Sequence, residues 1–507
     1  MTATRAILAD VDKFLASDAL DAQLIKCTLL ASATPRGLAE FAQRGKKQEA
    51  LVGKLLGDDA LMKQMLEAGG ANEGKYGQSM DLYTEIQKAS KRAHEGLFQR
   101  FALGSALHYP KDDDTEKQVK VNTYLNYEQA YLDGELDPAF KTLTTWEYRF
   151  IIPQQRSLAD VIWMRKMLRN YRADHITNPD YKWRYIAIVR SDVPYGPARR
   201  IPGSDLSHMQ QILAVGRSCG PRAFTEKLST ASFGIPTRGA RQPGHAAMSH
   251  WTPDGWTVCL GAHWRHNHWD GRCGMDFLLE TQAREHPQGY WQVLRAQWIG
   301  DALGEQKVSG MRYGSGGGLW NALAFYKKKA IVEEAEMAEV ALTGEELAES
   351  NVSAEAEKFP QVELTEADKK ITVGSDGVIT VPVAACRSPK STGKVRFMKS
   401  FGGGIQMHYN LAGKRPELRR YTIEVPEAGK YKLAARVVTM TMDRSLLLRL
   451  NRRTLIDISL PYTCGMWKDT KPVTVALKEG RNKLDFTCKV PNKGLTIKHF
   501  TLTPLGG

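Results

Sequence analysis

The sequence of 507 residues contains no long apolar run. A membrane-spanning helix needs about 18 to 20 predominantly apolar residues in a row, so the sequence predicts none. Cysteines are also few: seven of them, an odd number, are scattered along the chain without a Cys-x-x-Cys pair. This pattern argues against a zinc ribbon and against a framework of disulfide bonds, and it leaves open an isolated bridge such as Cys464 with Cys488.

Other absences concern nucleotide binding, repeats and secretion. The glycine-rich stretch GSGGG at 314–318 lacks the Gly-Lys-Ser/Thr ending of a phosphate-binding loop, so we expect no phosphate site there. No internal repeat is found. The opening stretch MTATRAILADVDKFL lacks the apolar centre of a signal peptide. We therefore expect an extracellular or periplasmic location if a leader has been removed, and a cytoplasmic one otherwise.

The composition of the chain is typical of a large globular protein. Apolar residues make up 42% and charged residues 25% of the sequence, and its length suits about two to four domains. The net charge of +14 is unevenly distributed: residues 371–507 hold 24 Lys and Arg against 9 Asp and Glu, a net of +15. Residues 331–370 hold 12 acidic against 3 basic residues, a net of −9. The basic surplus predicts an anionic partner or a solubilising field around the C-terminal part.

Changes of residue pattern along the chain predict a multidomain α+β protein. Residues 1–110 show the 3.6-residue periodicity and strong helix formers of an N-terminal helical region. Residues 140–325 have a mixed α/β pattern, in which WRYIAIVRSDVPYG at 183–196 predicts a strand that runs into a turn. An acidic linker follows at 326–370. Residues 371–507 alternate short β runs with turns, as a β-sandwich does.

One cysteine stands at the start of a predicted helix, in GRSCGPRAFTEKLSTASFGIP. Pro221 suits the first turn, and apolar residues recur at helical spacing up to Gly234, which can end the helix. Free backbone N–H groups and the positive end of the helix dipole therefore converge on Cys219. Such a position favours the nucleophilic thiolate form of a cysteine. The alternative is a small buried residue with a packing role.

The stretch HAAMSHWTPDGWTVCLGAHW at 245–264 predicts a β-hairpin. Its Thr-Pro-Asp-Gly tetrapeptide is a good turn, and the flanking residues alternate in polarity. A turn centred there pairs Ser249 with Val258. The continued ladder then places His245, which opens the first strand, opposite Ala262.

The stretches CGPRAF, FGIP, GHAAMSHW and DGWTVCLG, within roughly residues 180–270, resemble the transglutaminase-like superfamily. The resemblance implies a papain-like α+β domain with motif residues in the order Cys, His, Asp. It assigns Cys219 as the nucleophile and His245 as the base that takes its proton. No acidic residue lies opposite this histidine, so the candidates for the third position are His263, after a one-residue slip, and Asp270, if the strand turns back. An imidazole without an orienting partner can hold the wrong tautomer.

Five further residues are predicted to line the same cleft and bind substrate. They are Arg241, Trp264, Trp269, Tyr195 and Asp192. The arginine suits an acidic group and the tryptophans suit a sugar ring or an apolar side chain, while loop positions in solvent and core packing are the alternatives. The stretch HWRHNHWDG at 263–271 holds three histidines and an aspartate, but no second cluster of ligands occurs elsewhere. We therefore expect no metal and no other cofactor.

The C-terminal part resembles β-sandwich carbohydrate-binding modules over nearly all of residues 371–507. The extended strands, the LKEGRNKL turn and the final IKHFTL strand carry this resemblance. Such modules often stack an aromatic residue of an end loop on a sugar, which implies a glycan-binding role for Trp467 and Tyr462 in PYTCGMWKDT. The net charge favours a sulfated or carboxylated polysaccharide as partner, and no recognition helix or stacking motif favours nucleic acid.

Two functions of different classes follow from these features. The first is a cysteine-dependent hydrolase or transamidase acting on an amide or ester of a peptide, glycopeptide or glycan-associated substrate, with backbone N–H groups at the helix start stabilising the oxyanion. The alternative is a carbohydrate-active protein, polysaccharide lyase-like or purely glycan-binding, that uses the same fold on an anionic polysaccharide without a thiol nucleophile. Replacing Cys219 with alanine should abolish turnover only in the first case.

Overall fold

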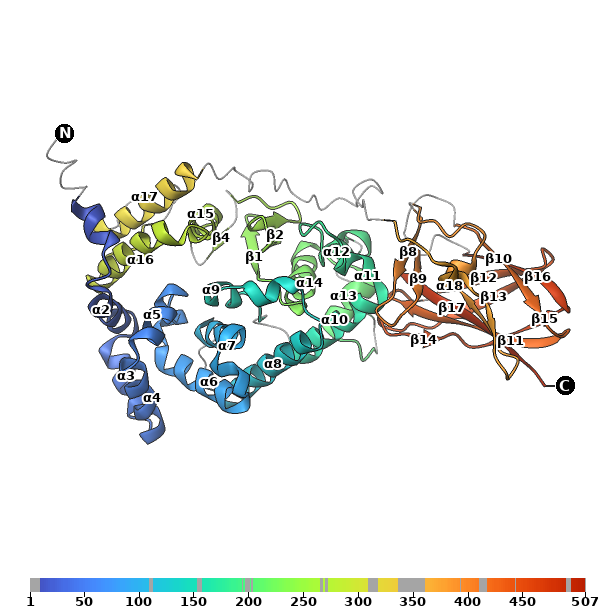
Figure 1. Cartoon of the computed structure of the whole chain (residues 1–507), viewed down its shortest axis with the longest axis horizontal. Helices are drawn as coiled ribbons and strands as arrows, with labels where there is room; N and C mark the ends of the chain where they lie inside the picture. The colour runs from blue at the N-terminus through green and yellow to red at the C-terminus, as the bar shows by residue number, and fades with distance from the viewer. Residues whose placement is uncertain are drawn as a thin grey trace. The chain divides into compact units, whose positions relative to one another are not determined.

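The computed structural model describes residues 10–108, 113–152, 157–193, 195–196, 201, 204–264, 268–269, 272–308, 318–335, 361–392, 394–409, 417–442, 444–488 and 494–506. The chain forms two compact units (Figure 1). Unit 1 comprises Met1–Leu158 and Thr230–Ala348, and unit 2 comprises Ala159–Ser229 and Glu349–Gly507. The fold is mixed α+β, with a helical N-terminal region and a β-sheet C-terminal region, as the sequence predicts.

Helices make up most of unit 1. Their bounds are α2 Asp21–Ala33, α3 Pro35–Ala42, α4 Lys46–Leu56, α5 Asp59–Glu67, η1 Asn72–Gly74, α6 Tyr76–Ala89, η2 Lys91–His94, α7 Gly96–His108, α8 Asp114–Leu132, η3 Pro138–Thr142, α9 Thr145–Tyr148, α15 Gly274–Arg284, α16 Pro287–Ala302 and α17 Leu319–Glu334. Side-chain caps set several starts: the Asp58 carboxylate accepts from the Leu61 N–H at 2.9 Å before α5. Thr144 and Glu147 form a capping box at α9.

A five-stranded antiparallel sheet also belongs to unit 1, in the order β3-β2-β1-β4-β5. Its strands are β1 Thr237–Gln242, β2 His245–His250, β3 Thr257–Cys259, β4 His268–Trp269 and β5 Arg272–Cys273. The predicted hairpin is confirmed, because Ser249 pairs with Val258. Thr252 and Gly255 exchange backbone hydrogen bonds of 3.1 and 3.0 Å across the predicted turn.

The hairpin ends earlier than the sequence predicts. Strand β3 stops at Cys259, and Leu260 and Gly261 then adopt φ values of 57° and 72°. Left-handed backbone of this kind cannot continue a ladder. The expected pairing of His245 with Ala262 is therefore wrong, and Leu260 lies beside the histidine instead.

Unit 2 contains a helical segment and the β-sheets of the C-terminal part. The helices are α10 Leu158–Tyr171, α11 Ala173–Ile176, α12 Ala187–Ser191, α13 His208–Val215 and α14 Cys219–Ser232, the last turn of which belongs to unit 1. The strand predicted at 183–196 is wrong, since α12 occupies this stretch. Ala187, Ile188 and Val189 are all buried. A run buried on every side has no periodicity that separates a helix from a strand.

The C-terminal part is a β-sandwich. One sheet has the order β10-β16-β12-β13, and the other has β14-β11-β17-β7-β6, with β15 on β11, β9 on β17 and β8 on β9. The bounds are β6 Thr372–Val373, β7 Ile379–Pro382, β8 Val395–Lys399, β9 Ile405–Tyr409, β10 Arg419–Val425, β11 Gly429–Thr439, β12 Arg444–Leu450, β13 Thr454–Leu460, β14 Lys468–Asp469, β15 Val473–Leu477, β16 Gly480–Cys488 and β17 Leu495–Pro504, with α18 Glu366–Lys369 and η4 Val383–Ala385.

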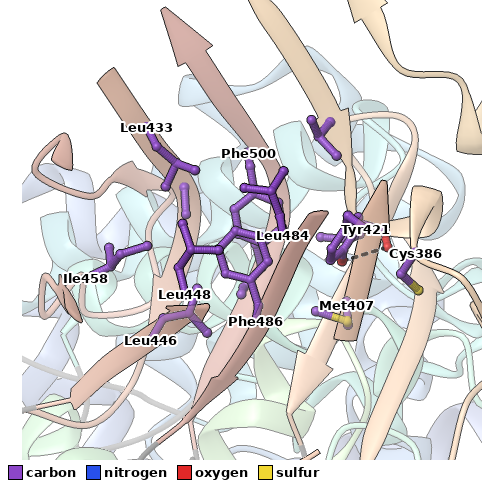
Figure 2. Close-up of a cluster of buried hydrophobic side chains, with 14 of the residues drawn as sticks. Cys386, Met407, Tyr421, Leu433, Leu446, Leu448, Ile458, Leu484, Phe486 and Phe500 are labelled. Carbon is purple, nitrogen blue, oxygen red and sulfur yellow. Dashed lines mark hydrogen bonds between the residues drawn. The ribbon is translucent and has the colours of Figure 1, made fainter. Parts of the chain in front are cut away.

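The core of the sandwich fills the space between these two sheets (Figure 2). Burial alternates along Arg419–Val425, as expected when one face of a strand points inward. The rings of Phe486 and Phe500 stack with centroids 4.0 Å apart. The Tyr421 hydroxyl donates to the Val383 carbonyl at 3.0 Å, which satisfies a polar group inside this apolar core (Figure 2).

Helix α10 is joined to the sandwich by hydrogen bonds to backbone carbonyls. The Trp163 indole donates to the Cys464 carbonyl at 2.9 Å, and the Asn170 amide donates to the Gly465 carbonyl at 3.1 Å. The Gln406 amide of β9 donates to the Asn170 carbonyl at 2.8 Å. The loop before β14 is thereby fixed in place by the helical segment of the same unit.

The structure bears on three expectations from the sequence, which concern disulfide bonds, membrane-spanning helices and metal ligands. The six cysteines whose side chains are described are free thiols, so the bridge between Cys464 and Cys488 that the sequence left open is not formed. Within the described part of the chain, no helix combines the length and apolarity needed to cross a membrane. No group of three or more metal-ligating side chains occurs among the same residues.

Candidate functional site

The thiol of Cys219 stands at the first residue of α14, as the sequence predicts. The side chain is half-buried, and Pro221 occupies the first turn. The buried guanidinium of Arg222 donates to the Val193 carbonyl, which ties this first turn to the end of the α12 segment. Gly234 follows the helix with a φ of 79°, a conformation that favours glycine and ends the helix.

The imidazole of His245, at the start of β2, has a backbone partner. Its Nε2 lies 2.6 Å from the Leu260 carbonyl oxygen. A carbonyl can only accept, so Nε2 carries the proton and Nδ1 is left as the acceptor in the neutral ring. Gln242 holds the same turn through its amide, which donates to the Gly261 carbonyl at 3.4 Å and accepts from the His263 N–H at 3.2 Å. The orienting partner that the sequence lacked is a carbonyl, not a carboxylate.

The two predicted catalytic residues fall in different compact units, Cys219 in unit 2 and His245 in unit 1. Their pairing stays a prediction. The candidates for the third position fare differently. His263 is exposed, and its backbone rather than its ring bonds to Gln242. Asp270 lies outside the described residues.

Among the predicted substrate-binding residues, Asp192 is not a solvated loop residue. It is buried, with 7% of its surface exposed. Its carboxylate accepts from the Tyr171 hydroxyl at 2.7 Å and from the Arg172 guanidinium at 3.0 Å. Tyr195, in contrast, is 57% exposed, with the Arg222 guanidinium 5.6 Å from its ring centroid. Asp192 therefore has a structural ion-pair role, and Tyr195 keeps an accessible ring.

Three predicted substrate contacts belong to unit 1. Arg241 is exposed on β1. Trp264 is 1% exposed and stacks near Phe277, with an interplanar angle of 19°, so it packs in the core and does not form a cleft wall. The backbone of Trp269 lies in β4, and its side chain is outside the described residues.

Sequence reasoning missed a buried ionic cluster in unit 2. The Arg172 guanidinium donates to both oxygens of Asp174 at 2.9 Å and to Asp192 at 3.0 Å. Arg172 has no exposed surface. A buried guanidinium needs such paired acceptors, because an unpaired buried charge is costly. Arg172 also holds the pKa of the Asp174 carboxyl below its usual range, against the opposing effect of burial.

The cluster reaches into the sandwich through His408 of β9. Its Nδ1 lies 2.9 Å from the Thr496 hydroxyl of β17, which in turn donates to the Tyr171 carbonyl at 3.0 Å. The His408 Nε2 lies 3.8 Å from Asp192. Burial, together with the nearby Arg172 charge, lowers the pKa of His408 to about 3, so the ring is neutral at physiological pH.

The predicted glycan-binding aromatics lie in the loop before β14. Trp467 is half-buried, and the Lys498 ammonium stands 5.9 Å from its ring centroid. Tyr462 is also half-buried, but its hydroxyl is buried near Cys464, and burial raises the pKa of this phenol. Trp467 therefore remains the candidate for a stacking platform, and the polar end of Tyr462 is turned away from solvent.

Lys498, which lies near Trp467, has basic neighbours on the same sheet. Arg436 of β11 is the register partner of both His499 of β17 and Asp469 of β14. Its guanidinium lies 3.3 Å from the Asp469 carboxylate. Lys498 donates to the Gly402 carbonyl at 2.9 Å. The sequence does contain a signal for this basic patch of Arg436, Lys498 and His499, because the adjacent polar pair Lys-His in LTIKHFTL interrupts an alternating strand.

A second aromatic residue lies next to this patch. Phe401 is 45% exposed, directly before Gly402 in the loop between β8 and β9. The Arg169 guanidinium of α10 stands 4.4 Å from the Phe401 ring centroid. Such a distance is typical of a cation–π contact. The helical segment of unit 2 thus adds one cation and the β8–β9 loop adds one ring that the sequence did not single out.

Comparison with known proteins gives likeness in fold. No protein-family model matches the sequence, and no curated protein matches it. Similar solved structures include a GH26-CBM35 β-(1,4)-mannanase of Podospora anserina, the C-terminal CBM6 of a marine laminarinase of Zobellia galactanivorans, and a carbohydrate-binding module of Cellvibrio mixtus lichenase 5A in complex with cellotriose.

These three structures are 19%, 20% and 18% identical to the chain, with TM-scores of 0.22, 0.21 and 0.21. The matches cover 26%, 25% and 25% of this chain. They cover 28% of the mannanase chain, but 98% and 97% of the two modules. At these identities and TM-scores the likeness is one of fold and carries no argument about function.

Proposed function

We propose that the protein binds carbohydrate through its C-terminal β-sandwich, with Trp467 as the ring on which a sugar stacks. The observation that carries the proposal is the position of this half-buried indole beside Lys498, in a loop that α10 holds rigid. An indole offers a large apolar face at small entropic cost, and a fixed loop reduces the cost of ordering the site further. The basic surplus of residues 371–507 favours glycans that carry acidic groups.

The test is affinity electrophoresis of the full chain through gels that contain single polysaccharides, neutral or acidic. Trp467→Ala should weaken retention about tenfold, since stacking and burial of the indole together are worth roughly 1–2 kcal/mol. Trp291→Ala is the matched control, because this half-buried indole of unit 1 also has a lysine ammonium near it, Lys63 at 4.3 Å. Retention that is absent from every gel, or equal in the two variants, would contradict the proposal.

A cysteine-dependent hydrolase is the second candidate, and the orientation of His245 favours it. With Nε2–H donating to the Leu260 carbonyl, Nδ1 is free of the ring proton and has the state a general base needs. In the proposed step, Nδ1 takes the Cys219 proton and the sulfur attacks the carbonyl carbon of an amide or ester. The imidazolium then returns the proton to the leaving amine or alcohol, and water hydrolyses the thioester.

Alkylation of Cys219 by iodoacetamide between pH 4 and 9, followed by peptide mass spectrometry, tests this second candidate. Fast labelling at acid pH that is lost in His245→Ala would support a thiolate–imidazolium pair. His94→Ala is the control, because it removes an exposed imidazole elsewhere in unit 1 whose Nε2 also lies near a backbone carbonyl, that of Gln87 at 3.1 Å. Slow labelling that neither variant changes would make the thiol structural. Turnover of a polysaccharide that survives Cys219→Ala would favour the lyase form of the carbohydrate hypothesis.

A further inference from the structure

We infer that the face of the sheet beside Trp467 selects acidic sugars, with Arg436, Lys498 and His499 binding a carboxylate or sulfate group while the indole stacks on the ring. This inference rests on the proposed glycan-binding function and names the class of ligand.

A β-bulge directs two consecutive side chains of β17 to the same face. The register between β11 and β17 shifts so that Arg436 pairs with His499 while the next residue, Val437, pairs with Ile497, leaving Lys498 unpaired. Ile497 and Phe500 are buried in the core, and the two residues between them are half-exposed. In a regular strand one of these two would point into the core. The bulge therefore adds a cation to the outer face, as bulges at binding sites do.

The charges gathered on this face are not balanced. Arg436, Lys498 and His499 are neighbours, and the described carboxylate that contacts them is Asp469, whose side chain is 62% exposed. Burial and the nearby Arg436 lower the pKa of the Lys498 ammonium. Burial and, to a smaller extent, the charge of Lys498 lower the pKa of the His499 imidazole. Like charges held together are unfavourable, so an anion that binds among them removes part of that cost.

Lys498 connects the cations to the aromatic platform. Its ammonium donates to the Gly402 carbonyl at 2.9 Å and stands 5.9 Å from the Trp467 centroid, so the side chain is held between the β8–β9 loop and the indole. An acidic group on a sugar stacked on Trp467 would lie within reach of this ammonium. Charge-assisted hydrogen bonds to such a group are about twice as strong as neutral ones. Phe401, with Arg169 against its ring, extends the patch along the same loop.

Calorimetric titration of the full chain with trigalacturonate and with its fully methyl-esterified form tests the inference, because the two ligands share their sugar rings and differ in charge. The acid should bind at least about tenfold more tightly than the ester. Lys498→Gln and Arg436→Gln should each weaken binding of the acid about fivefold to tenfold and leave binding of the ester unchanged. Arg449→Gln is the control, since it removes an exposed cation from β12 of the other sheet.

The outcomes separate the inference from the proposed function. If the ester binds as tightly as the acid, depends on Trp467 and ignores both cation variants, the inference fails and glycan binding stands. If neither ligand binds and chondroitin sulfate oligosaccharide does, with loss in the same variants, the selected acid is sulfate. If oligothymidylate binds more tightly than every glycan, the patch is a nucleic-acid site and the inference is overturned. Thermal unfolding of each variant guards against misfolding, and Lys498→Arg should restore binding of the acid.

Discussion

The outer face of the larger sheet of the sandwich has two parts that treat charge in opposite ways. On β9 and the start of β17, His408 and Thr496 are covered by the helical segment of unit 2, where Arg172 is paired with two aspartates. A few residues further along β17, Lys498 lies near Arg436, and the carboxylate that contacts this pair among the described residues is the exposed one of Asp469.

Charged residues in the covered part stabilise the fold, whereas those in the open part are available to a ligand. In the covered part Arg172 and its two aspartates are buried and paired with one another, and the pairing stabilises the fold of unit 2. In the open part Lys498 and Arg436 lie close enough to repel each other, which is a cost that an acidic ligand can offset. Three predictions test this difference, in order of decreasing expected effect, and a fourth concerns the imidazole of His245 in unit 1.

The largest effect is expected from the same substitution made in both parts. Arg172→Gln should lower the free energy of unfolding of unit 2 by about 3 to 5 kcal/mol, because Asp174 and Asp192 would be left as buried charges without their partner. Arg436→Gln should cost less than about 1 kcal/mol, since its contact with Asp469 is exposed. Unfolding by guanidinium chloride, monitored by hydrogen exchange of the backbone amides in β9 and β17, measures the loss of stability in both variants. Equal losses would remove the distinction between the two parts.

Acid should destabilise the covered part through its histidines. The pKa of His408 is lowered to about 3 by burial and Arg172, and burial also lowers that of His175, so both rings bind protons only after unfolding. The unfolded state therefore binds more protons below the ordinary histidine pKa of about 6.5, and stability falls as the pH decreases from there toward 3. For His408 alone the loss between pH 7.5 and 4.5 should be about 2.7 kcal/mol.

Denaturant titrations of the full chain and of His408→Gln at the two pH values measure this loss. The variant should lose about 2.7 kcal/mol less than the parent on acidification. The charged groups near the two rings, which set the background of the measurement, are Arg172, Asp174, Asp192 and Arg396. A parent protein with the same stability at both pH values would contradict the neutral, buried state of the histidines.

A smaller loss is expected from the hydroxyl that links the sandwich to the helical segment. Thr496→Val keeps the shape of the side chain and removes its hydrogen bonds to His408 and to the Tyr171 carbonyl. Two buried groups then lose a partner, which should cost about 1 to 3 kcal/mol. Thr501→Val on the same strand is the control. If both valines have the same effect on the unfolding midpoint, the contact between Thr496 and the helical segment adds nothing to stability.

The smallest energetic effect is expected at Gln242, and it concerns the imidazole. Gln242→Ala frees the turn that presents the Leu260 carbonyl, so the Nε2–H tautomer of His245 should lose population without a large change in stability. Nitrogen-15 NMR of labelled histidine distinguishes the two tautomers. Gln242→Glu, which retains the acceptor for the His263 N–H, should restore part of the population. An unchanged tautomer in Gln242→Ala would show that the turn is fixed without this side chain.

Local sequence patterns predicted the parts of the molecule that depend on near neighbours. The helix that begins at Cys219, the hairpin register of Ser249 with Val258, and the alternating strands of the sandwich all follow from capping, turn and periodicity rules. These features need only residues a few positions apart. The nucleophile and base could be proposed on the same basis, together with the family resemblance.

Features that depend on tertiary contacts could not be predicted from local sequence patterns. The partner of Asp192 is Arg172, 20 residues away, so the sequence suggested a loop where the structure has a buried ion pair. Trp264 is a core residue because Phe277 lies against it, and α12 is a helix inside a fully buried run. The bulge at Lys498 was visible as a break in alternation, but its meaning depends on Arg436 of another strand.

The most direct test of the account is the titration of the His499 ring in the full chain with carbon-13-labelled histidine, assigned with His499→Gln, in the presence and absence of trigalacturonate. Burial and Lys498 lower the pKa of His499 in the free protein. The account predicts that the ligand raises this pKa, because a carboxylate placed beside Lys498 and Arg436 stabilises the charged ring. A titration midpoint that stays the same at saturating ligand would contradict binding of the acidic group at this face.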